Sequence, residues 1–149
     1  MTIFEAPQYD PRQARRRNQI IIVSVIVVVL IGTVLWWFRN WPEEHVVGKF
    51  FTALQAKDYK SAYGVWIADP NWQQKPPLAR YTYDDFYRDW GPSGEWGPIN
   101  TFKVDGAATP KDSNGVVVLI TINGRKEQAN VFVDKHDHSI SFSPFEVVK

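Results

Sequence analysis

Metal binding is the most specific chemistry that the residue types of this chain suggest, and it is confined to the stretch DKHDH. His136 and His138 alternate there, so a strand or turn could point both imidazoles in one direction, with Asp134 or Asp137 adding an oxygen. A zinc site needs three or four ligands, and the sequence indicates no others. We therefore interpret the stretch as a hydrated turn between two strands and predict no metal site.

Acid–base and nucleophilic chemistry have no recognisable motif in the sequence. Asp84, Asp85 and Asp89 lie close together, but Arg88 stands beside them, which is typical of a solvated helix face. The chain has no cysteine, which excludes a thiolate nucleophile, a cysteine metal site and disulfides. No Gly-rich phosphate loop, nucleophile elbow or HExxH motif occurs. We predict no catalytic residue, no cofactor and no enzymatic activity.

Charge gives no indication of a nucleic-acid partner. The formal net charge is only +1 for 149 residues. The one basic cluster lies in a short N-terminal segment, where Glu5 and Asp10 dilute it and only Phe4 and Tyr9 supply aromatic rings. We therefore expect no nucleic acid among the partners.

The longest apolar run is 20–38, IIIVSVIVVVLIGTVLWWF, which contains no charged, amide, proline or histidine residue. As a helix rising about 1.5 Å per residue it would span roughly 28 Å, close to the hydrocarbon thickness of a bilayer, whereas a buried strand would end after about eight residues. The run is therefore predicted to be a transmembrane helix. The side chains expected to anchor it in the lipid bilayer and its interface include Ile20, Val27, Leu30, Leu35, Trp36, Trp37 and Phe38.

The flanks of this run differ in charge. Before it stand Arg12, Arg15, Arg16 and Arg17. After it comes only Arg39, soon followed by Glu43 and Glu44, so the positive-inside rule places the N-terminus in the cytoplasm. The run is too long for a signal peptide and lacks small residues for cleavage, which favours an uncleaved signal anchor.

These features predict a single-pass protein of the cell inner (cytoplasmic) membrane, with three parts. Residues 1–19 would form an extended, disordered cytoplasmic tail and 20–38 the membrane helix. Residues 42–149 would form one periplasmic or extracytoplasmic domain, since this length suffices for a single hydrophobic core.

The first part of the external domain has helical periodicity. From Pro42 onward, apolar residues recur at spacings of three and four: Val46, Val47, Phe50, Phe51 and Leu54. Asp58 is expected to cap a second helix with an aromatic stripe ending at Trp66. Thr82, with Asp85 three residues later, is expected to begin a third.

Two loops separate the second helix from the third and the third from the C-terminal part of the domain. DPNWQQKPPLAR and GPSGEWGP contain too much proline and glycine for regular structure. They hold Trp72 and Trp96, and the second loop is expected to leave Trp96 exposed. Tryptophan is enriched at protein interfaces, so both residues are candidate interface residues.

From residue 100 onward the apolar period changes to two. It predicts strands at 101–104, 116–122, 128–133 and 139–145, and Asn123-Gly124 predicts a tight type I′ hairpin. In the last strand Ile140, Phe142 and Pro144 are expected on the buried face. The predicted fold class is α+β, a transmembrane helix followed by three helices packed on a curved antiparallel four-stranded sheet.

The order of these elements resembles a known family. VVGKFFTALQAKDYKSAYGVW joins a long and a short helix through Lys57-Asp58-Tyr59, and a third helix and strands ending in ISFSPF come after it. This resembles the nuclear-transport-factor-like, or cystatin-like, α+β cone, in the branch of small bacterial domains that follow one membrane helix. The likeness covers 43–145 and implies a curved sheet around the long helix, with a pocket. Members use it for catalysis, for ligands or only for docking, and single-span members include secretion-system assembly factors and accessory subunits of envelope complexes.

The preferred hypothesis is a non-catalytic accessory or assembly subunit. Its external domain would mediate protein–protein interaction with other subunits of a membrane or envelope complex, or with its own copies. An alternative is a pocket for an apolar or lipid-like ligand, which predicts an enclosed cavity with a few polar groups. A less favoured alternative is a small enzyme, which requires a buried ionisable pair with opposed pKa shifts at the cavity.

Overall fold

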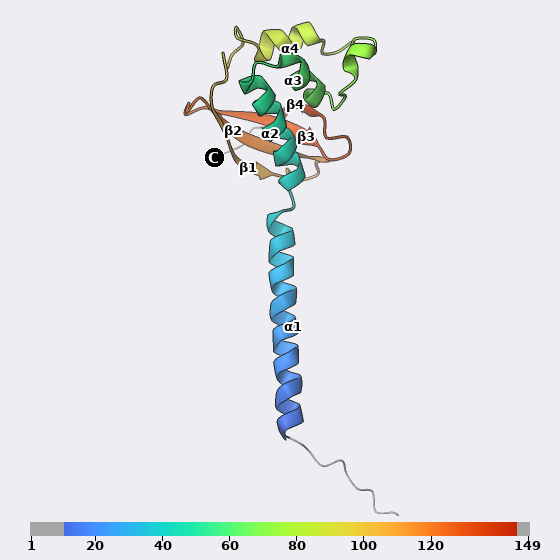
Figure 1. Ribbon diagram of the computed structural model, residues 1–149, viewed down its shortest axis with the longest axis vertical. Coiled ribbons are helices and arrows are strands. Elements are labelled where there is room, and N and C mark those ends of the chain that lie inside the picture. The colour runs from blue at the N-terminus through green and yellow to red at the C-terminus, as the bar shows by residue number, and fades with distance from the viewer. Residues whose placement is uncertain (1–10, 146–149) are drawn as a thin grey trace, which may run out of the picture. The chain divides into compact units, whose positions relative to one another are not determined.

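The computed structural model describes residues 11–145 of the chain. The chain divides into two compact units, Met1–Arg39 and Asn40–Lys149. Its class is α+β, with one long apolar helix near the N-terminus and a four-stranded antiparallel sheet in the second unit (Figure 1).

The first unit contains a single helix, α1 (Pro11–Trp37), of 27 residues. None of its residues is buried, and the exposed fraction of its large apolar side chains runs from 46% for Val27 to 76% for Trp37. A helix of a water-soluble domain would cover such side chains with other parts of the protein. By length and composition α1 is able to cross a membrane.

The helix begins earlier than the sequence predicted. Residues 11–19 are helical, so the expectation of an extended tail is wrong for this part, and Arg12, Arg15, Arg16 and Arg17 all belong to α1. Pro11 is compatible with a first helical turn, and Arg, Gln and Ala have high helix propensity. These residues only extend a helix that the apolar run already nucleates, which costs little. The rest of the predicted tail, 1–10, lies outside the described residues.

The second unit begins with three α-helices, as the periodicity predicted: α2 (Trp41–Gln55), α3 (Tyr59–Trp66) and α4 (Tyr83–Trp90). A short 3₁₀ helix, η1 (Trp72–Gln74), lies between α3 and α4. Asp58 caps α3 by accepting a hydrogen bond from the Ser61 amide at 3.1 Å. Thr82 and Asp85 form a full capping box at the start of α4. Both predicted helix starts are therefore confirmed.

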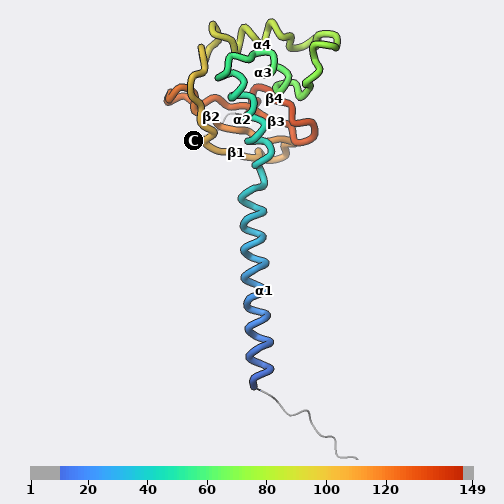
Figure 2. Tube along the Cα trace, in the orientation of Figure 1, coloured from blue at the N-terminus to red at the C-terminus, as the bar shows by residue number. Residues whose placement is uncertain are grey.

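The sheet is a meander of β1 (Phe102–Ala108), β2 (Gly115–Ile122), β3 (Gln128–Asp134) and β4 (Ile140–Phe142). Each strand pairs antiparallel with the next, in the order β1-β2-β3-β4. Figure 2 traces the chain from α4 through a loop into these strands. Successive side chains of a strand point to opposite faces of the sheet, so the even-numbered residues of β2 and the odd-numbered residues of β3 share one buried face.

Strand β1 is longer than the predicted 101–104 because it continues past a bulge. The register with β2 shifts between Val104 and Gly106, which leaves Asp105 as the extra residue. The Asp105 carboxylate accepts hydrogen bonds from the Thr121 hydroxyl and from Gln128 Nε2 (2.8 Å). These bonds, the first above all, hold its pKa below the ordinary aspartate value. The polar network fixes the bulge, which sequence alternation alone did not indicate.

Strand β4 is shorter than the predicted 139–145. Ile140 is buried as expected, but Phe142 is 52% exposed and Pro144 is exposed, so the predicted burial of these two residues is wrong. Pairing with β3 ends at Phe142. Pro144 has no N–H to offer a ladder, and Ser143 and Phe145 instead hydrogen-bond to each other in a local turn.

The Asn123-Gly124 turn forms, but not as a tight hairpin. Both residues have positive φ, 51° and 67°, and the Arg125 amide donates to the Ile122 carbonyl at 2.9 Å, as a type I′ turn requires. The register, however, pairs Thr121 with Gln128, so the connection is longer than two residues. Asn123 Oδ1 meanwhile accepts from the amides of residues 100 and 101, which ties the turn to the start of β1.

One hydrophobic core joins the helices to the sheet. Phe50 of α2 is fully buried, and its ring meets four other aromatic rings with centroids 5.1 to 6.0 Å away. The core cluster contains Val47, Phe50, Phe51, Leu54, Ala62, Tyr63, Trp66, Phe86, Trp90, Ile99, Val116, Val118, Ile120, Ile122, Ala129, Val131, Val133 and Ile140. All three helices of the unit and strands β2 to β4 contribute, so the core positions the loops between them.

Candidate functional site

The DKHDH stretch forms the turn between β3 and β4. His136 and His138 are exposed there. Asp134 accepts from the His136 amide (2.7 Å) and from Asn114 Nδ2 (2.6 Å), while Asp137 accepts from the Ser139 amide (2.8 Å), which lowers the Asp137 pKa. Within residues 11–145 no three His, Cys, Asp or Glu side chains gather in a way that could hold a metal ion. The carboxylates of this turn accept hydrogen bonds from its own backbone and from the Asn114 side chain of the neighbouring loop.

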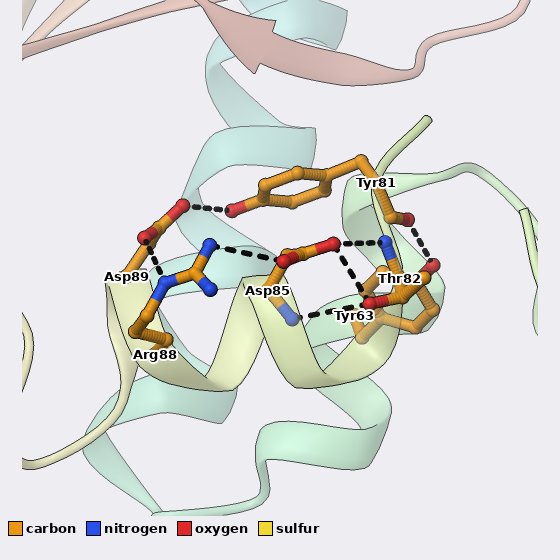
Figure 3. Close-up of polar contacts among 6 residues, drawn as sticks. All are labelled: Tyr63, Tyr81, Thr82, Asp85, Arg88 and Asp89. Carbon is orange, nitrogen blue, oxygen red and sulfur yellow. Dashed lines mark hydrogen bonds and ion pairs between the residues drawn. The ribbon is translucent and has the colours of Figure 1, made fainter. Parts of the chain in front are cut away.

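The acidic residues of α4 also serve local structure. Asp85 accepts from the Thr82 amide (3.1 Å) and hydroxyl (2.8 Å), and its second oxygen receives Arg88 Nη2 at 2.9 Å (Figure 3). The bonds from Thr82 are the main reason that the Asp85 pKa is lowered, with Arg88 adding to it. A carboxylate held in this way stays ionised near neutral pH and has no proton to donate as a general acid.

Two tyrosines extend this network across the segment before α4 (Figure 3). The Tyr63 hydroxyl donates to the Tyr81 carbonyl at 2.7 Å, and the Tyr81 hydroxyl donates to Asp89 at 3.0 Å. Burial, followed by the neighbouring Asp89, raises the Tyr81 pKa far above the ordinary tyrosine value. A phenol that keeps its proton so firmly is a poor acid–base catalyst, so the network is suited to joining α3 to α4.

Trp72, one of the two candidate interface residues, lies in η1 and is half-buried. Its Nε1 donates to the Lys60 carbonyl at 3.2 Å, and its ring stacks on Tyr83 (centroids 5.2 Å apart) and meets the edge of Tyr63 (4.8 Å). Gly64 permits this approach, because a Cβ there would lie 3.3 Å from Trp72 Cδ1. The ring is thus a fixed platform with one face covered.

Trp96 is half-buried, whereas the sequence predicted that it would be exposed. The Arg125 guanidinium lies over its ring, 5.6 Å from the centroid, and Arg125 Nη1 donates to the Glu95 carbonyl at 3.2 Å. The loop is therefore held against the β2–β3 connection. A role for Trp72 or Trp96 at an interface with another protein stays a prediction.

Two hollows of about 520 Å³ each are lined in part by Trp72. We name the first the lysine hollow, lined by Val46, Lys49, Lys60, Ser61, Gly64, Val65, Ala68, Pro70, Trp72, Gln73 and His138. We name the second the proline hollow, lined by Tyr63, Ile67, Asp69, Trp72, Gln73, Lys75, Pro76, Pro77, Leu78, Thr82, Tyr83 and Asp84. Sequence reasoning had picked out Trp72 but not the hollows, because they depend on how η1 folds back on α3.

Glu43 is a buried carboxylate that sequence reasoning missed. It is 5% exposed, and its Oε2 has no hydrogen-bond partner among the described residues. It lies in the first turn of α2, near the positive end of the helix dipole. Its burial could have been predicted from its spacing, because Glu43 stands four residues before Val47 and seven before Phe50, on the helix face that packs on the core.

No protein-family model, curated protein or solved structure matches this chain. The class of protein is therefore defined by the described residues alone. They form a helix long and apolar enough to cross a membrane and an α+β unit with two hollows around one packed tryptophan.

Proposed function

We propose that the chain is a non-catalytic, single-pass membrane subunit whose α+β domain docks on other proteins, either subunits of an envelope or membrane complex or further copies of itself. The main observation behind this proposal is the contrast between helix α1 and the second unit. Helix α1 exposes its large apolar side chains, and the second unit commits its aspartates at 58, 85, 134 and 137 to helix caps and turns. A bilayer would cover the apolar side chains of α1. Because these aspartates serve local structure and not acid–base chemistry, we assign the second unit a role in binding.

The proposed location is the inner membrane, with the N-terminus in the cytoplasm and the α+β domain on the outer side. The arginines of α1 at 12, 15, 16 and 17 support this orientation, since basic residues are retained on the cytoplasmic side. On the far side of the apolar run only Arg39 precedes the acidic start of α2. Trp36 and Trp37 suit the interface between lipid and water.

The proposed fold of the domain is the nuclear-transport-factor-like, or cystatin-like, cone. Three features favour it: a long helix followed by two shorter ones, a meander of four antiparallel strands, and a core made by one face of that sheet with all three helices. The bulge at Asp105 would give the sheet the curvature that such a cone needs.

The proposed contact surface is the segment that forms the proline hollow. Leu78 is 48% exposed, and Pro76 and Pro77 precede it in a segment without regular secondary structure, where the two prolines leave little conformational entropy to lose. Trp72 and Tyr83 stack beneath, which gives the surface a rigid aromatic base. A partner that covers Leu78 and the two prolines would bury apolar area without rearranging the domain.

The test is purification of the full chain in mild detergent, with measurement of the native particle mass and identification of co-eluting chains. Leu78→Asp places a charge on the proposed surface, and Pro92→Asp makes the matched change in the exposed loop after α4. We expect a companion protein or a second copy with the unchanged chain and with Pro92→Asp, and its loss with Leu78→Asp. A monomer without companions would contradict the proposal, and retention by Leu78→Asp would exclude this surface.

A further inference from the structure

We propose that the lysine hollow is a binding site for a small anionic amphiphile, a carboxylate or phosphate headgroup attached to a short apolar chain. This inference is independent of the proposed docking function, because it concerns a different hollow and requires no partner protein.

The headgroup preference comes from the charges around the hollow. Lys49 from α2, Lys60 from α3 and His138 from the β3–β4 turn line it, and no aspartate or glutamate does. Neither lysine forms an ion pair with another residue in the range 11–145. Asp58, whose charge interacts with Lys60, is held in the cap of α3. An anion placed here would meet two cations that have no competing ion pair.

The apolar part of the ligand is indicated by the rest of the lining. Val46, Val65, Ala68 and Pro70 contribute the apolar surface, and the Trp72 side chain forms one wall. The volume of about 520 Å³ lies within the usual range for sites of small organic ligands. Inorganic phosphate would contact the lysines but leave this surface unused, whereas an alkyl chain would cover it.

The proline hollow provides an internal comparison. It has the same volume and shares Trp72 and Gln73, but Asp69 and Asp84 line it. Its lysine, Lys75, already forms an ion pair with Asp69 at 2.6 Å. An anion is thus disfavoured in the proline hollow and favoured in the lysine hollow.

Two parts of the lysine hollow, the Trp72 side chain and the His138 backbone, are held in place before any ligand arrives. Trp72 is fixed by its bond to the Lys60 carbonyl and by its ring contacts. His138 adopts φ 59°, an uncommon conformation for a residue with a side chain, and its amide donates to the Asp134 carbonyl at 2.9 Å. Fixing these two parts reduces the entropy lost on binding.

The experiment uses the full chain, with ¹⁵N-labelled tryptophan, in nanodiscs of zwitterionic phosphatidylcholine. The Trp72 indole N–H resonance is assigned by its disappearance in Trp72→Phe, and octanoate, octyl phosphate, octanol and inorganic phosphate are titrated separately. Lys49→Gln and Lys60→Gln remove one charge each from exposed positions, and Lys111→Gln makes the same charge change in the β1–β2 connection. Empty nanodiscs correct for partition of each amphiphile into lipid.

We expect octanoate and octyl phosphate to shift the Trp72 resonance saturably. Lys49→Gln and Lys60→Gln should each weaken this binding by about tenfold, while Lys111→Gln leaves it unchanged within about twofold. Tight binding of octyl phosphate with weak binding of octanoate would assign a phosphate headgroup within the same proposal. Equal binding of octanol and octanoate, equal binding of inorganic phosphate and octyl phosphate, or affinity unaffected by both lysine substitutions would overturn it.

Discussion

Helix α1 and strand β2 share a high content of Val and Ile but differ in secondary structure and in burial. Both are rich in Val and Ile, which favour strands in water. In α1 such side chains are exposed, 67% for Val28 for instance, whereas Val118 of β2 is 0% exposed. The same amino acids thus form a helix without a covering layer in one unit and a fully covered strand in the other.

The difference shows that the length of an apolar run and the turn residues that end it determine the secondary structure more than intrinsic residue preference does. Strand β2 is eight residues long and is followed by the turn residues Asn123 and Gly124. At its start, Gly115 is required because the Phe132 ring occupies the space where a Cβ would lie. The apolar run of α1 contains one glycine, Gly32, but no turn sequence such as Asn-Gly, so its only way to satisfy every backbone group locally is a helix.

The largest expected effect is a charge inside β2. Val118→Asp would bury a carboxylate without a partner, so we expect the second unit to lose at least about 3–5 kcal/mol and to unfold. Near-ultraviolet circular dichroism of the full chain in detergent would report the loss of fixed aromatic packing. A folded variant with native thermal stability would contradict the burial of this face.

Removal of one core ring is expected to have a comparable but smaller effect. Phe50→Ala would leave a cavity among four aromatic neighbours and should lower the free energy of unfolding by about 3–5 kcal/mol. Thr52→Ala, on the exposed side of the same helix, is the control. Equal denaturation midpoints for the two variants would show that α2 does not pack on the core through Phe50.

The same substitution in α1 distinguishes the two regions. Val28→Asp should leave the stability of the second unit unchanged, because no described residue packs on this position. It should instead oppose membrane insertion by about 2.5–3.5 kcal/mol. The fraction of chain that integrates into membranes measures this effect. If Val28→Asp destabilised the second unit as Val118→Asp does, the two regions would not be independent in the way that the structure indicates.

The cap of α4 offers a smaller, local test. Thr82→Ala removes the hydroxyl of the capping box and should lower the free energy of unfolding of the second unit by about 1 kcal/mol. Thr82→Ser keeps the hydroxyl and should recover most of the loss. Chemical denaturation of both variants makes the comparison. No difference between them would show that the hydroxyl contributes nothing to helix stability.

The smallest expected effect is the loss of stability at low pH that is due to Asp85. Its pKa is lowered in the folded state by the bonds from Thr82, so its contribution is present above the unfolded value of about 3.9 and is lost as the pH falls through the folded value. We expect the melting temperature of the unchanged chain to fall more steeply below about pH 4 than that of Asp85→Asn. Parallel pH profiles would contradict this assignment.

Sequence reasoning predicted the elements whose signal is local. The spacing of apolar residues gave α2, α3 and α4, and Asp58 and Thr82 marked two helix starts through capping. The length of the apolar run predicted a long helix, and α1 is able to cross a membrane by length and composition. These signals need only a few neighbouring residues, so they survive without knowledge of the tertiary structure.

Features that depend on distant partners were not predictable. The bulge at Asp105 requires Thr121 and Gln128 from two other strands. The early end of β4 differs, because Pro144 and the Ser143–Phe145 turn that ends the pairing are local in sequence. The site was missed for the same reason as the bulge. Trp72 was identified as an unusual loop residue, but its packing depends on Gly64, which has no distinguishing pattern in the sequence.

Alkaline carbonate extraction of membranes from cells that express the full chain tests the anchoring role of α1 most directly. The expected result is that the chain stays in the membrane pellet and enters solution only with detergent, because the exposed apolar side chains from 20 to 38 are covered by lipid. Recovery of intact, folded chain in the carbonate supernatant would contradict a transmembrane α1 and, with it, the proposed membrane subunit.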